Sequence, residues 1–417
     1  MGRIRVLIVD DSAFMRHALG RLLGEVPSIE VVGVASNGVE GLQMAADLHP
    51  DVITLDVEMP VLDGLGMLKR LMAESPTRVV MLSNLTTASA NVTLDALEFG
   101  AIDFVPKPSG SLSIDIGRVG EELVGKIEAA AGMPEAAFLR HRRIAAMNLT
   151  LANPRKQAAD REAAAPPGAA GDGKTTAGTM PPRPRSMAWA MTPKRPPHTG
   201  PRIAARRLVV IASSTGGPTA LRTVIKDLPA NLGAAVAIVQ HMPPGFTASL
   251  AARLDSAGEL RCTEATSEDV LIENEILVAP GDRHMLSSTT GHIQLAHLPT
   301  VNGVRPAADV TLQSVAPIWG ERLLCVVLTG MGCDAREGAR AVKYHGGTVI
   351  AQDAASATIY GMPGAVAEAG LTDQILPLGQ IAAGISAWCH ARPHELAEDT
   401  VSTPLDPRFP NGTAFVS

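Results

Sequence analysis

The strongest constraint on the fold is an alternation of short aliphatic segments with amphipathic segments, which runs twice along the chain. In the first 130 residues the aliphatic segments are rich in β-branched residues and short enough to be buried strands. Strands that are apolar along their whole length are typical of parallel sheets covered by helices on both faces. We therefore expect residues 1–130 to form a doubly wound α/β domain, with strands near 5–9, 29–35, 52–55, 78–82 and 103–105.

The same alternation returns between residues 206 and 392. Apolar segments at 207–212, 234–240, 275–280 and 323–329 each predict a buried strand, with helical patterns between them. This predicts a second doubly wound parallel sheet. In such sheets the functional groups lie at the carboxyl ends of the strands, so the residues directly after each strand are the first candidates for a site.

Between these two domains the composition changes. From Arg140 to Arg207 there are fourteen Lys and Arg against three Asp and Glu, and ten prolines fall between Pro154 and Pro201. Proline at this density opposes regular helices and sheets. We predict a disordered linker over residues 131–205 and a similar flexible tail over 393–417. A solvated tether is the simpler interpretation of the basic charge, and contact with nucleic acid or lipid is the alternative.

Composition also limits the cellular setting. Hydrophobic residues make up 46% of the chain and aromatic residues only 3%, so aliphatic side chains should form both cores. The four cysteines, Cys262, Cys325, Cys333 and Cys389, form no C-x-x-C pair, which favours reduced thiols over disulfides or a thiolate zinc site. No apolar run approaches the ~20 residues of a membrane span, and the N-terminal run ends at Asp10. We expect a cytoplasmic protein without a signal peptide that is not integral to a membrane.

Carboxylates, a hydroxyl and a lysine follow the predicted strands of the first domain. Asp10 and Asp11 follow the first strand, Asp56 the third, Ser83 the fourth and Lys107 the fifth. Any one Asp could simply cap a helix. Three carboxylates on adjacent strand ends, however, repel one another unless a hard divalent cation such as Mg²⁺ lies among them. A carboxylate held there can attack phosphorus, and the Lys and Ser side chains can contact the new phosphoryl oxygens.

The segments V-L-I-V-D-D-S, L-D-V-E-M-P-V-L-D-G and G-A-I-D-F-V-P-K-P together resemble a two-component receiver domain, whose fold is flavodoxin-like. The resemblance implies that Asp56 accepts a phosphoryl group from a histidine kinase. It also implies that Asp10, Asp11 and Asp56, with the backbone of Glu58, hold Mg²⁺. The residues that it marks as the phosphorylation switch are Ser83, Lys107 and Phe104. A core role for Phe104 is compatible with this.

In the second domain, the first strand ends in A-S-S-T-G-G-P. Ser213, Ser214 and Thr215 leave the strand, and the two glycines and the proline that follow suit a tight turn into a helix. A hydroxyl here would lie near helix N–H groups, which can stabilise an oxyanion or bind a phosphate. A simple N-cap is the alternative role.

Two further strand ends supply the partners that a nucleophilic hydroxyl needs. His241 directly follows the strand A-V-A-I-V-Q, and Asp334 lies in the glycine-rich loop after L-L-C-V-V-L-T. Asp334 could instead cap the next helix, and Asp282 in P-G-D-R-H is a competing acid. Ser, His and Asp in these places follow the logic of a Ser-His-Asp triad, which predicts a serine hydrolase but names no substrate.

Several motifs of this domain together resemble the catalytic domain of the chemotaxis protein-glutamate methylesterases: A-S-S-T-G-G-P, V-Q-H-M-P-P-G-F-T, L-V-A-P-G-D-R-H-M, R-P-A-A-D-V, L-T-G-M-G-C-D and Y-G-M-P-G. With the receiver in front, the resemblance extends to the whole family architecture. It implies that Ser214 is the nucleophile, His241 the base and Asp334 the orienting acid. Thr215 and Met331 match positions beside the triad, and no cofactor is expected in this domain.

The chain departs from the family pattern at three positions near these motifs. Ser213 stands where Ala is usual, so a Ser214 variant could keep trace activity through its neighbour. Ala335 replaces a usual Gly after the acid, and Asn84 replaces a common second Ser. The linker is also longer than expected.

The resemblance implies a phosphorylation-activated esterase that hydrolyses γ-glutamyl methyl esters on the cytoplasmic domains of methyl-accepting chemoreceptors, releases methanol, and also deamidates receptor glutamines. Two alternatives stay open: the same hydrolase acting on a receptor outside chemotaxis, and a receiver-controlled regulator that binds through its basic linker without catalysis. No helix-turn-helix pattern with a basic face occurs, so we expect no nucleic-acid partner.

Overall fold

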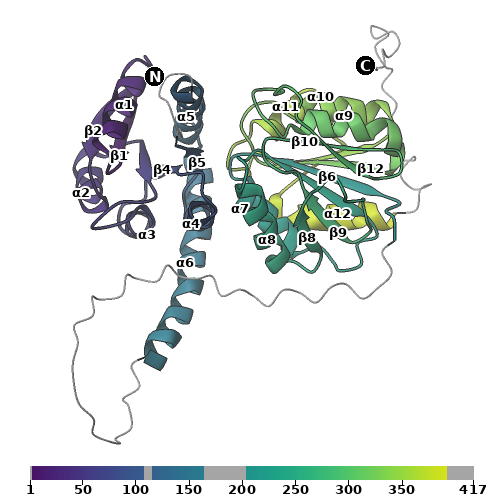
Figure 1. Cartoon of the computed structure of the whole chain (residues 1–417), viewed down its shortest axis with the longest axis horizontal. Helices are drawn as coiled ribbons and strands as arrows, with labels where there is room; N and C mark the ends of the chain where they lie inside the picture. The colour runs from purple at the N-terminus through teal and green to yellow at the C-terminus, as the bar shows by residue number, and fades with distance from the viewer. Residues whose placement is uncertain (1, 108–114, 164–202, 392–417) are drawn as a thin grey trace, which may run out of the picture.

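The computed structural model describes residues 2–107, 115–163 and 203–391. The first sheet has five parallel strands in the order β2-β1-β3-β4-β5, which is the flavodoxin-like order. Helices cover both of its faces (Figure 1). The strands are β1 (Ile4–Val9), β2 (Ile29–Ala35), β3 (Val52–Asp56), β4 (Arg78–Ser83) and β5 (Asp103–Pro106).

Alternation along β1 explains how this sheet is covered. Val6 and Ile8 pack in one hydrophobic cluster with α1 (Ala13–Gly24) and α5 (Asp115–Ala131). Leu7 and Val9 point to the opposite face and pack in another cluster, which includes side chains of the other three helices. These helices are α2 (Gly38–Leu48), α3 (Gly64–Glu74) and α4 (Thr87–Glu98).

The structure differs from the predicted linker over part of its length. Residues Glu135–Ala163 form a long helix, α6, which packs against α3 and α4. Phe138 is buried in the hydrophobic cluster that holds α1 and α5, Ala145 is also buried, and Asn148 Nδ2 donates to the carbonyl oxygen of Glu98 at 2.9 Å. The linker prediction followed the basic and proline-rich composition of 140–205. It gave no weight to the spaced apolar residues near the start of the segment, which form a face that can be buried. The parts of the predicted linker and tail at 164–202 and 392–417 lie outside the described residues.

The second sheet has seven parallel strands in the order β14-β13-β12-β6-β7-β9-β8. The four predicted strands form its centre, while β8, β13 and β14 were not predicted. Two of them, β8 and β14, are the edge strands of the sheet. The strands are β6 (Leu208–Ser213), β7 (Ala235–Gln240), β8 (Arg261–Glu264), β9 (Glu275–Val278), β12 (Leu323–Val327), β13 (Thr348–Gln352) and β14 (Gln374–Leu376).

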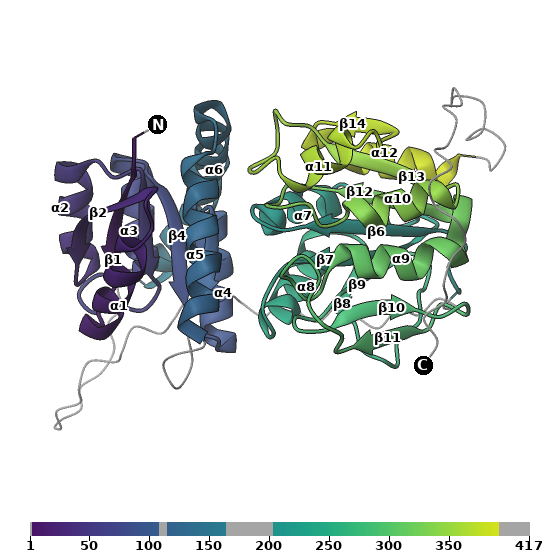
Figure 2. The ribbon, with the colours of Figure 1, turned by 90° about the horizontal axis from the view of Figure 1, so that it is seen from above.

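Helices lie on both faces of this sheet as well (Figure 2). One face carries α7 (Gly217–Lys226), α8 (Phe246–Ala257) and α12 (Leu378–His390). The other carries α9 (Ala308–Trp319), α10 (Arg336–Tyr344) and α11 (Met362–Glu368). A separate hairpin, β10 (His284–Ser287) with β11 (Ile293–Ala296), precedes α9, and a 3₁₀ turn (Gly320–Arg322) follows it.

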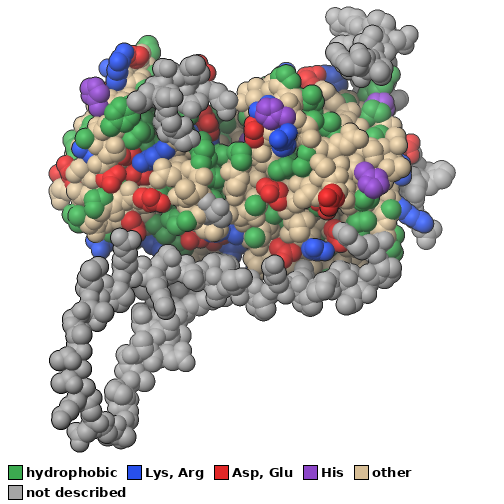
Figure 3. Space-filling view, in the orientation of Figure 1, with side chains coloured by type: hydrophobic (Ala, Val, Ile, Leu, Met, Phe, Trp, Pro, Cys, Tyr) green, Lys and Arg blue, Asp and Glu red, His purple; other side chains and the backbone are tan. Residues whose placement is uncertain are grey.

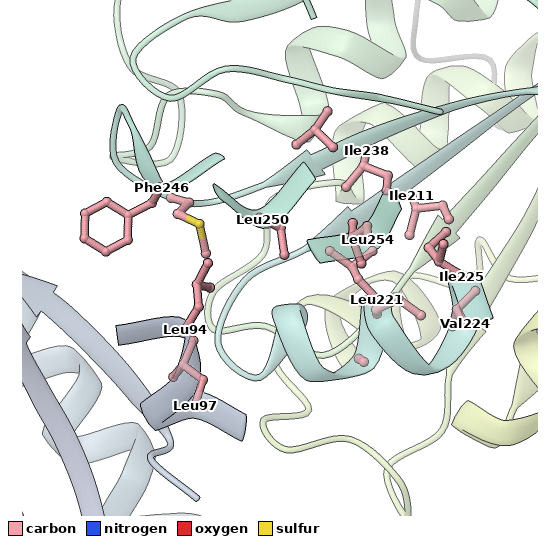
Figure 4. Close-up of a cluster of buried hydrophobic side chains, with 14 of the residues drawn as sticks. Leu94, Leu97, Ile211, Leu221, Val224, Ile225, Ile238, Phe246, Leu250 and Leu254 are labelled. Carbon is pink, nitrogen blue, oxygen red and sulfur yellow. The ribbon is translucent and has the colours of Figure 1, made fainter. Parts of the chain in front are cut away.

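The two domains share a hydrophobic contact. Leu94 and Leu97 of α4 belong to the same buried cluster as Phe246 and Leu250 of α8, as the close-up in Figure 4 shows. Phe104 of β5 stacks on Phe246, with ring centroids 4.7 Å apart and planes inclined by 14°. The first domain therefore presents α4 and β5 to the second domain.

Candidate active site

The candidate catalytic residues meet at the carboxyl ends of the central strands of the second sheet. Ser214 follows β6, His241 follows β7, and Asp334 lies in the loop between β12 and α10. Because β6 lies between β7 and β12, the three residues come to the place where the order of the sheet reverses. This is where an open α/β sheet positions its functional groups.

His241 and Asp334 form a close pair. His241 Nε2 lies 2.7 Å from Asp334 Oδ2, and the two side chains are only 9% and 2% exposed. Asp334 Oδ2 also accepts from the backbone N–H of Ala308, and Oδ1 accepts from that of Asp309, at 2.6 and 3.0 Å. Burial alone would raise the pKa of Asp334, but His241 and these two N–H groups more than offset it and hold the pKa below its usual value.

The ionised Asp334 fixes the tautomer of His241. An acceptor-only carboxylate requires Nε2 of the ring to carry the proton that it donates. Nδ1 then keeps a lone pair, which is what a general base needs. Asp282, the competing acid, is half exposed and pairs with Arg305 and His297 at 3.0 and 3.3 Å, so it is not a partner of His241.

Backbone hydrogen bonds hold the loop that carries Ser214. The backbone N–H of Ser214 donates to the carbonyl of Thr329 at 3.0 Å, and the carbonyl of Ser214 accepts from the N–H of Gly217 at 2.8 Å. Gly216 has φ +76°, and a Cβ on Gly217 would come within 2.0 Å of Gln240 Oε1. Only glycines therefore allow this turn into α7.

Gln240 joins the nucleophile loop to the base loop. Its Nε2 donates to the carbonyls of Ser214 and His241 at 2.9 and 3.1 Å, and its Oε1 accepts from Ser213 Oγ at 2.7 Å. Ser213 is completely buried. The expectation that Ser213 could replace Ser214 is therefore not supported, because its hydroxyl points into the protein and is already engaged.

Two residues predicted to flank the triad also contact the first domain. The hydroxyl of Thr215 donates to Asp103 Oδ2 at the start of β5, and Thr215 is only 2% exposed. A Cβ on Gly125 of α5 would lie 3.2 Å from Met331 Cε, so Met331 lies directly against the receiver. Sequence analysis placed both residues beside the triad but could not show that the other domain contacts them, burying Thr215 and leaving Met331 partly exposed.

Sequence analysis missed two residues that lie beside Asp334. Asn302 Nδ2 is 3.3 Å from Asp334 Oδ1 and 2.9 Å from Asp309 Oδ2. Asp309 is 4% exposed, and burial together with the charge of Asp334 raises its pKa to about 6. The motif R-P-A-A-D-V contains Asp309, but nothing in the pattern showed that α9 brings it to the same place as Asp334.

The first sheet gathers the predicted phosphorylation residues. Oxygen atoms of Asp10, Asp11 and Asp56 all lie within 4.8 Å of one another. Lys107 Nζ lies 2.8 Å from Asp10 Oδ2 and 2.6 Å from Asp56 Oδ2, and the backbone N–H of Glu58 donates to Asp56 Oδ1 at 3.3 Å. Burial raises the pKa of Asp56 to about 6, although Lys107 opposes the rise.

The donor set of this cluster fits Mg²⁺. All three side chains offer hard carboxylate oxygens, and Asp11 is exposed, which leaves room for water ligands. A single lysine partly balances the two buried carboxylates, Asp10 and Asp56, so an added cation would be stabilised here.

Of the predicted switch residues, Lys107 lies in this cluster, whereas Phe104 contacts the second domain. Ser83 is buried; its hydroxyl accepts from Thr93 Oγ1 at 2.7 Å and donates to the carbonyl of Asn84 at 3.3 Å. Phe104 is 3% exposed because Phe246 covers it. Phe104 is thus buried where the two domains meet. This place is compatible with both predicted roles, a core residue and a switch residue.

Comparisons with known proteins match both halves of the chain. The model for the CheB methylesterase family matches residues 209–385, and the model for the response regulator receiver domain matches residues 6–114. A Symbiobacterium thermophilum protein named protein-glutamate methylesterase/protein-glutamine glutaminase is 45% identical over 383 residues, which are 92% of this chain and 96% of that protein. A Thermotoga maritima protein of the same name is 40% identical over 381 residues, 91% of this chain and 96% of its own.

A solved structure matches the second domain. The crystal structure of the Thermotoga maritima CheB methylesterase catalytic domain is 43% identical and covers 44% of this chain and 98% of its own, with a TM-score of 0.43.

Among the described residues, no helix combines the length and the apolar character that a membrane crossing requires.

Proposed function

The chain belongs to the family of receiver-linked protein-glutamate methylesterases/protein-glutamine glutaminases, and from this premise we propose how its residues hydrolyse the methyl esters of protein glutamates. The observation that carries the proposal is the buried His241–Asp334 pair, at 2.7 Å. His241 follows β7 and Asp334 follows β12, and these are the two neighbours of β6, the strand that Ser214 follows. Strand position and family motifs supplied the three residues, and the pair supports the roles proposed for His241 and Asp334.

In the proposed mechanism, Ser214 Oγ attacks the ester carbonyl while His241 Nδ1 takes its proton. Asp334 holds the ring in the required tautomer and stabilises the imidazolium that forms. His241 then returns the proton to the methoxy oxygen, the C–O bond breaks, and methanol leaves an acyl-enzyme on Ser214. Water, deprotonated in turn by His241, hydrolyses the acyl-enzyme to the glutamate carboxyl and restores Ser214.

The tetrahedral intermediate needs hydrogen-bond donors for its oxyanion. The turn that follows Ser214 enters α7 at Gly217, and backbone N–H groups at a helix N-terminus carry partial positive charge. We assign the oxyanion site to this turn. Deamidation of a glutamine passes through the same intermediate, with ammonia in place of methanol as the leaving group, so the same residues serve both activities.

The receiver is positioned to control access to this site. Asp103 accepts the Thr215 hydroxyl, one residue from the nucleophile, and Met331 packs at Gly125. Arg253 of α8 donates to Asp95 Oδ1 at 2.7 Å and to the carbonyl of Asn91 at 2.6 Å. We infer that this docked arrangement is the low-activity form, and that phosphorylation of Asp56 shifts the population towards an undocked form.

Asp56 is the proposed phosphoryl acceptor from a histidine kinase. Its carboxylate would attack phosphorus to give an acyl phosphate, and Lys107, now 2.6 Å away, would pair with a phosphoryl oxygen. Mg²⁺ held by Asp10, Asp11 and Asp56 would neutralise charge on the phosphoryl group. The proposed substrates are the cytoplasmic domains of methyl-accepting chemoreceptors, and enzyme, kinase and receptor would meet in the cytoplasm.

The alternative of a binding regulator has less support. On the face drawn in Figure 3, Lys and Arg side chains are interspersed with Asp and Glu rather than gathered into a basic patch. The buried His–Asp pair also has no evident use in a protein that only binds. A receptor outside chemotaxis remains an alternative substrate for the same chemistry.

Methanol release from methylated receptor membranes tests the catalytic assignment. We expect Ser214→Ala to lower the rate at least a thousandfold. Ser213→Ala is the matched control, because it removes a neighbouring hydroxyl that is buried, and it should keep most of the activity. Undiminished release by Ser214→Ala would contradict the mechanism.

A further inference from the structure

Asp334 has a second buried carboxyl beside it. Asp309, in the first turn of α9, is 4% exposed, and the backbone N–H of Asp309 donates to Asp334 Oδ1 at 3.0 Å. Asp309 Oδ1 accepts from the backbone N–H of Gly338 at 2.7 Å. A catalytic acid and an additional carboxyl therefore share one poorly solvated place, at the N-terminal end of α9.

Two carboxylates so close compete for a proton. Burial and the charge of Asp334 raise the pKa of Asp309 to about 6, while hydrogen bonds hold that of Asp334 below its usual value. The other titratable groups that influence the pair are His241, Glu337 and the buried thiol of Cys325, whose pKa is raised by burial and by both carboxylates. The proposed mechanism requires that any proton reside on Asp309, because a protonated Asp334 could no longer orient His241.

One side chain contacts both carboxyls. Asn302 Nδ2 donates to Asp309 Oδ2 at 2.9 Å and to Asp334 Oδ1 at 3.3 Å, and its two N–H bonds suffice for both. Asn302 is exposed at a loop tip, yet its amide points inward to this pair. With this amide in place, each oxygen of Asp334 has two donors.

The loop holds this amide by its backbone geometry. Val301 and Val304 exchange backbone hydrogen bonds of 3.2 and 3.0 Å around Asn302 and Gly303, which have φ +54° and +77°. Asparagine and glycine are the residues that tolerate such a turn. The buried His284 anchors both sides of the turn: its Nε2 lies 3.0 Å from the carbonyl of Pro299, and its Nδ1 accepts from the N–H of Ala307.

We propose that Asn302 is a positioning residue of the hydrolase: its amide bridges Asp309 and Asp334 and keeps Asp334 ionised and oriented towards His241. The proposal rests on the assignment of Asp334 as the orienting acid. Asn302 contacts no reacting atom in this account; it acts through Asp334.

Methanol release, measured from pH 5 to 9 with the full-length chain and a small phosphodonor, tests this role. Asn302→Gly removes the amide but suits the positive φ. We expect kcat to fall on the order of tenfold, the loss of a hydrogen bond to a charged group, with KM little changed. Without the amide the pair binds a proton at higher pH, so the acid limb of kcat/KM should also move to higher pH.

Two further variants separate this role from a structural one. Gly303→Ala strains the same turn but keeps the amide, and it should leave the acid limb in place. Adding Asp309→Asn to Asn302→Gly removes the second carboxyl, so it should return the acid limb towards the wild-type position.

Three results would overturn the proposal: an unmoved acid limb in Asn302→Gly, the same shift in Gly303→Ala, or no recovery in the double variant. Ser214→Ala, assayed alongside, tells the two hypotheses apart. If it stays active, the catalytic assignment itself fails; if it is inactive while Asn302→Gly behaves as wild type, only the role of Asn302 fails.

Discussion

Both domains place acidic side chains at the carboxyl ends of parallel strands, but they neutralise them differently. In the receiver, a single lysine contacts Asp10 and Asp56, and the exposed Asp11 lies beside them. In the catalytic domain, Asp334 is surrounded by backbone N–H groups of α9, an asparagine amide and His241.

The difference concerns how easily the charge can change. A lysine ammonium on a flexible side chain can move from one oxygen to another, so the receiver cluster can accept a cation or a phosphoryl group. Backbone N–H groups cannot move without unfolding a helix, so the charge of Asp334 stays fixed. In the mechanism proposed above, the same place in two similar sheets would therefore serve a switch in one domain and a permanent orienting acid in the other.

The largest expected effect comes from removing the fixed charge. Asp334→Asn keeps the size of the side chain but offers His241 an amide, which favours the wrong tautomer. We expect the rate of methanol release to fall about 10⁴-fold. Asp282→Asn is the matched control, since Asp282 pairs with Arg305 away from His241, and it should keep activity within a few fold. An equal fall in the rate of methanol release in both variants would contradict the assignment of Asp334, rather than Asp282, as the orienting acid.

The second effect concerns stability and pH. Because the pKa of Asp56 is raised to about 6 in the folded receiver, its ionisation costs stability as the pH rises from about 4 to 6. Asp56→Asn should therefore stabilise the receiver at pH 7 by about 2 kcal/mol, with no gain below pH 4. Hydrogen exchange of the β1 and β3 amides in urea measures this. Mg²⁺ should stabilise the wild type and not the variant.

Asp47→Asn, which changes an exposed carboxylate on α2, is the control for this experiment and should have little effect at any pH. A gain for Asp56→Asn that did not depend on pH would show that burial of the charge is not its cause.

The smallest effect tests the contact between the domains. Arg253→Gln removes the hydrogen bonds from α8 to Asp95 and Asn91 of α4. If docking suppresses activity, release of methanol without a phosphodonor should rise on the order of three- to tenfold. Arg261→Gln, at an exposed position on β8, should leave it unchanged. Unaltered basal activity in Arg253→Gln would contradict control by this contact.

Sequence reasoning predicted the parts of this molecule that follow from strand periodicity. Each β-branched segment of the first domain forms a strand. Asp10, Asp11, Asp56 and Lys107 lie together after these strands, whereas Asp282 of the second domain pairs with Arg305 away from His241. It failed where contacts between distant segments decide the outcome. The early part of α6 is helical because Phe138 packs in the cluster on the α1 and α5 face and the helix lies against α3 and α4, contacts that the local composition does not reveal.

Near the active site the same limit applies. Asn302 and Asp309 reach Asp334 only because a turn and a helix N-terminus converge on it. Thr215 lies next to the nucleophile in its motif and Met331 shares a motif with Asp334, but each also contacts the receiver. The hydrophobic periodicity of a sequence does not indicate how two domains dock.

The most direct test of the account is whether charge at one site governs chemistry at the other. We would measure methanol release from methylated receptor membranes by the wild type and by Asp56→Asn, each with and without Mg²⁺ and a small phosphodonor. The account predicts that the phosphodonor raises the rate in the wild type alone, and only with Mg²⁺. Equal stimulation of both proteins, or of neither, would contradict it.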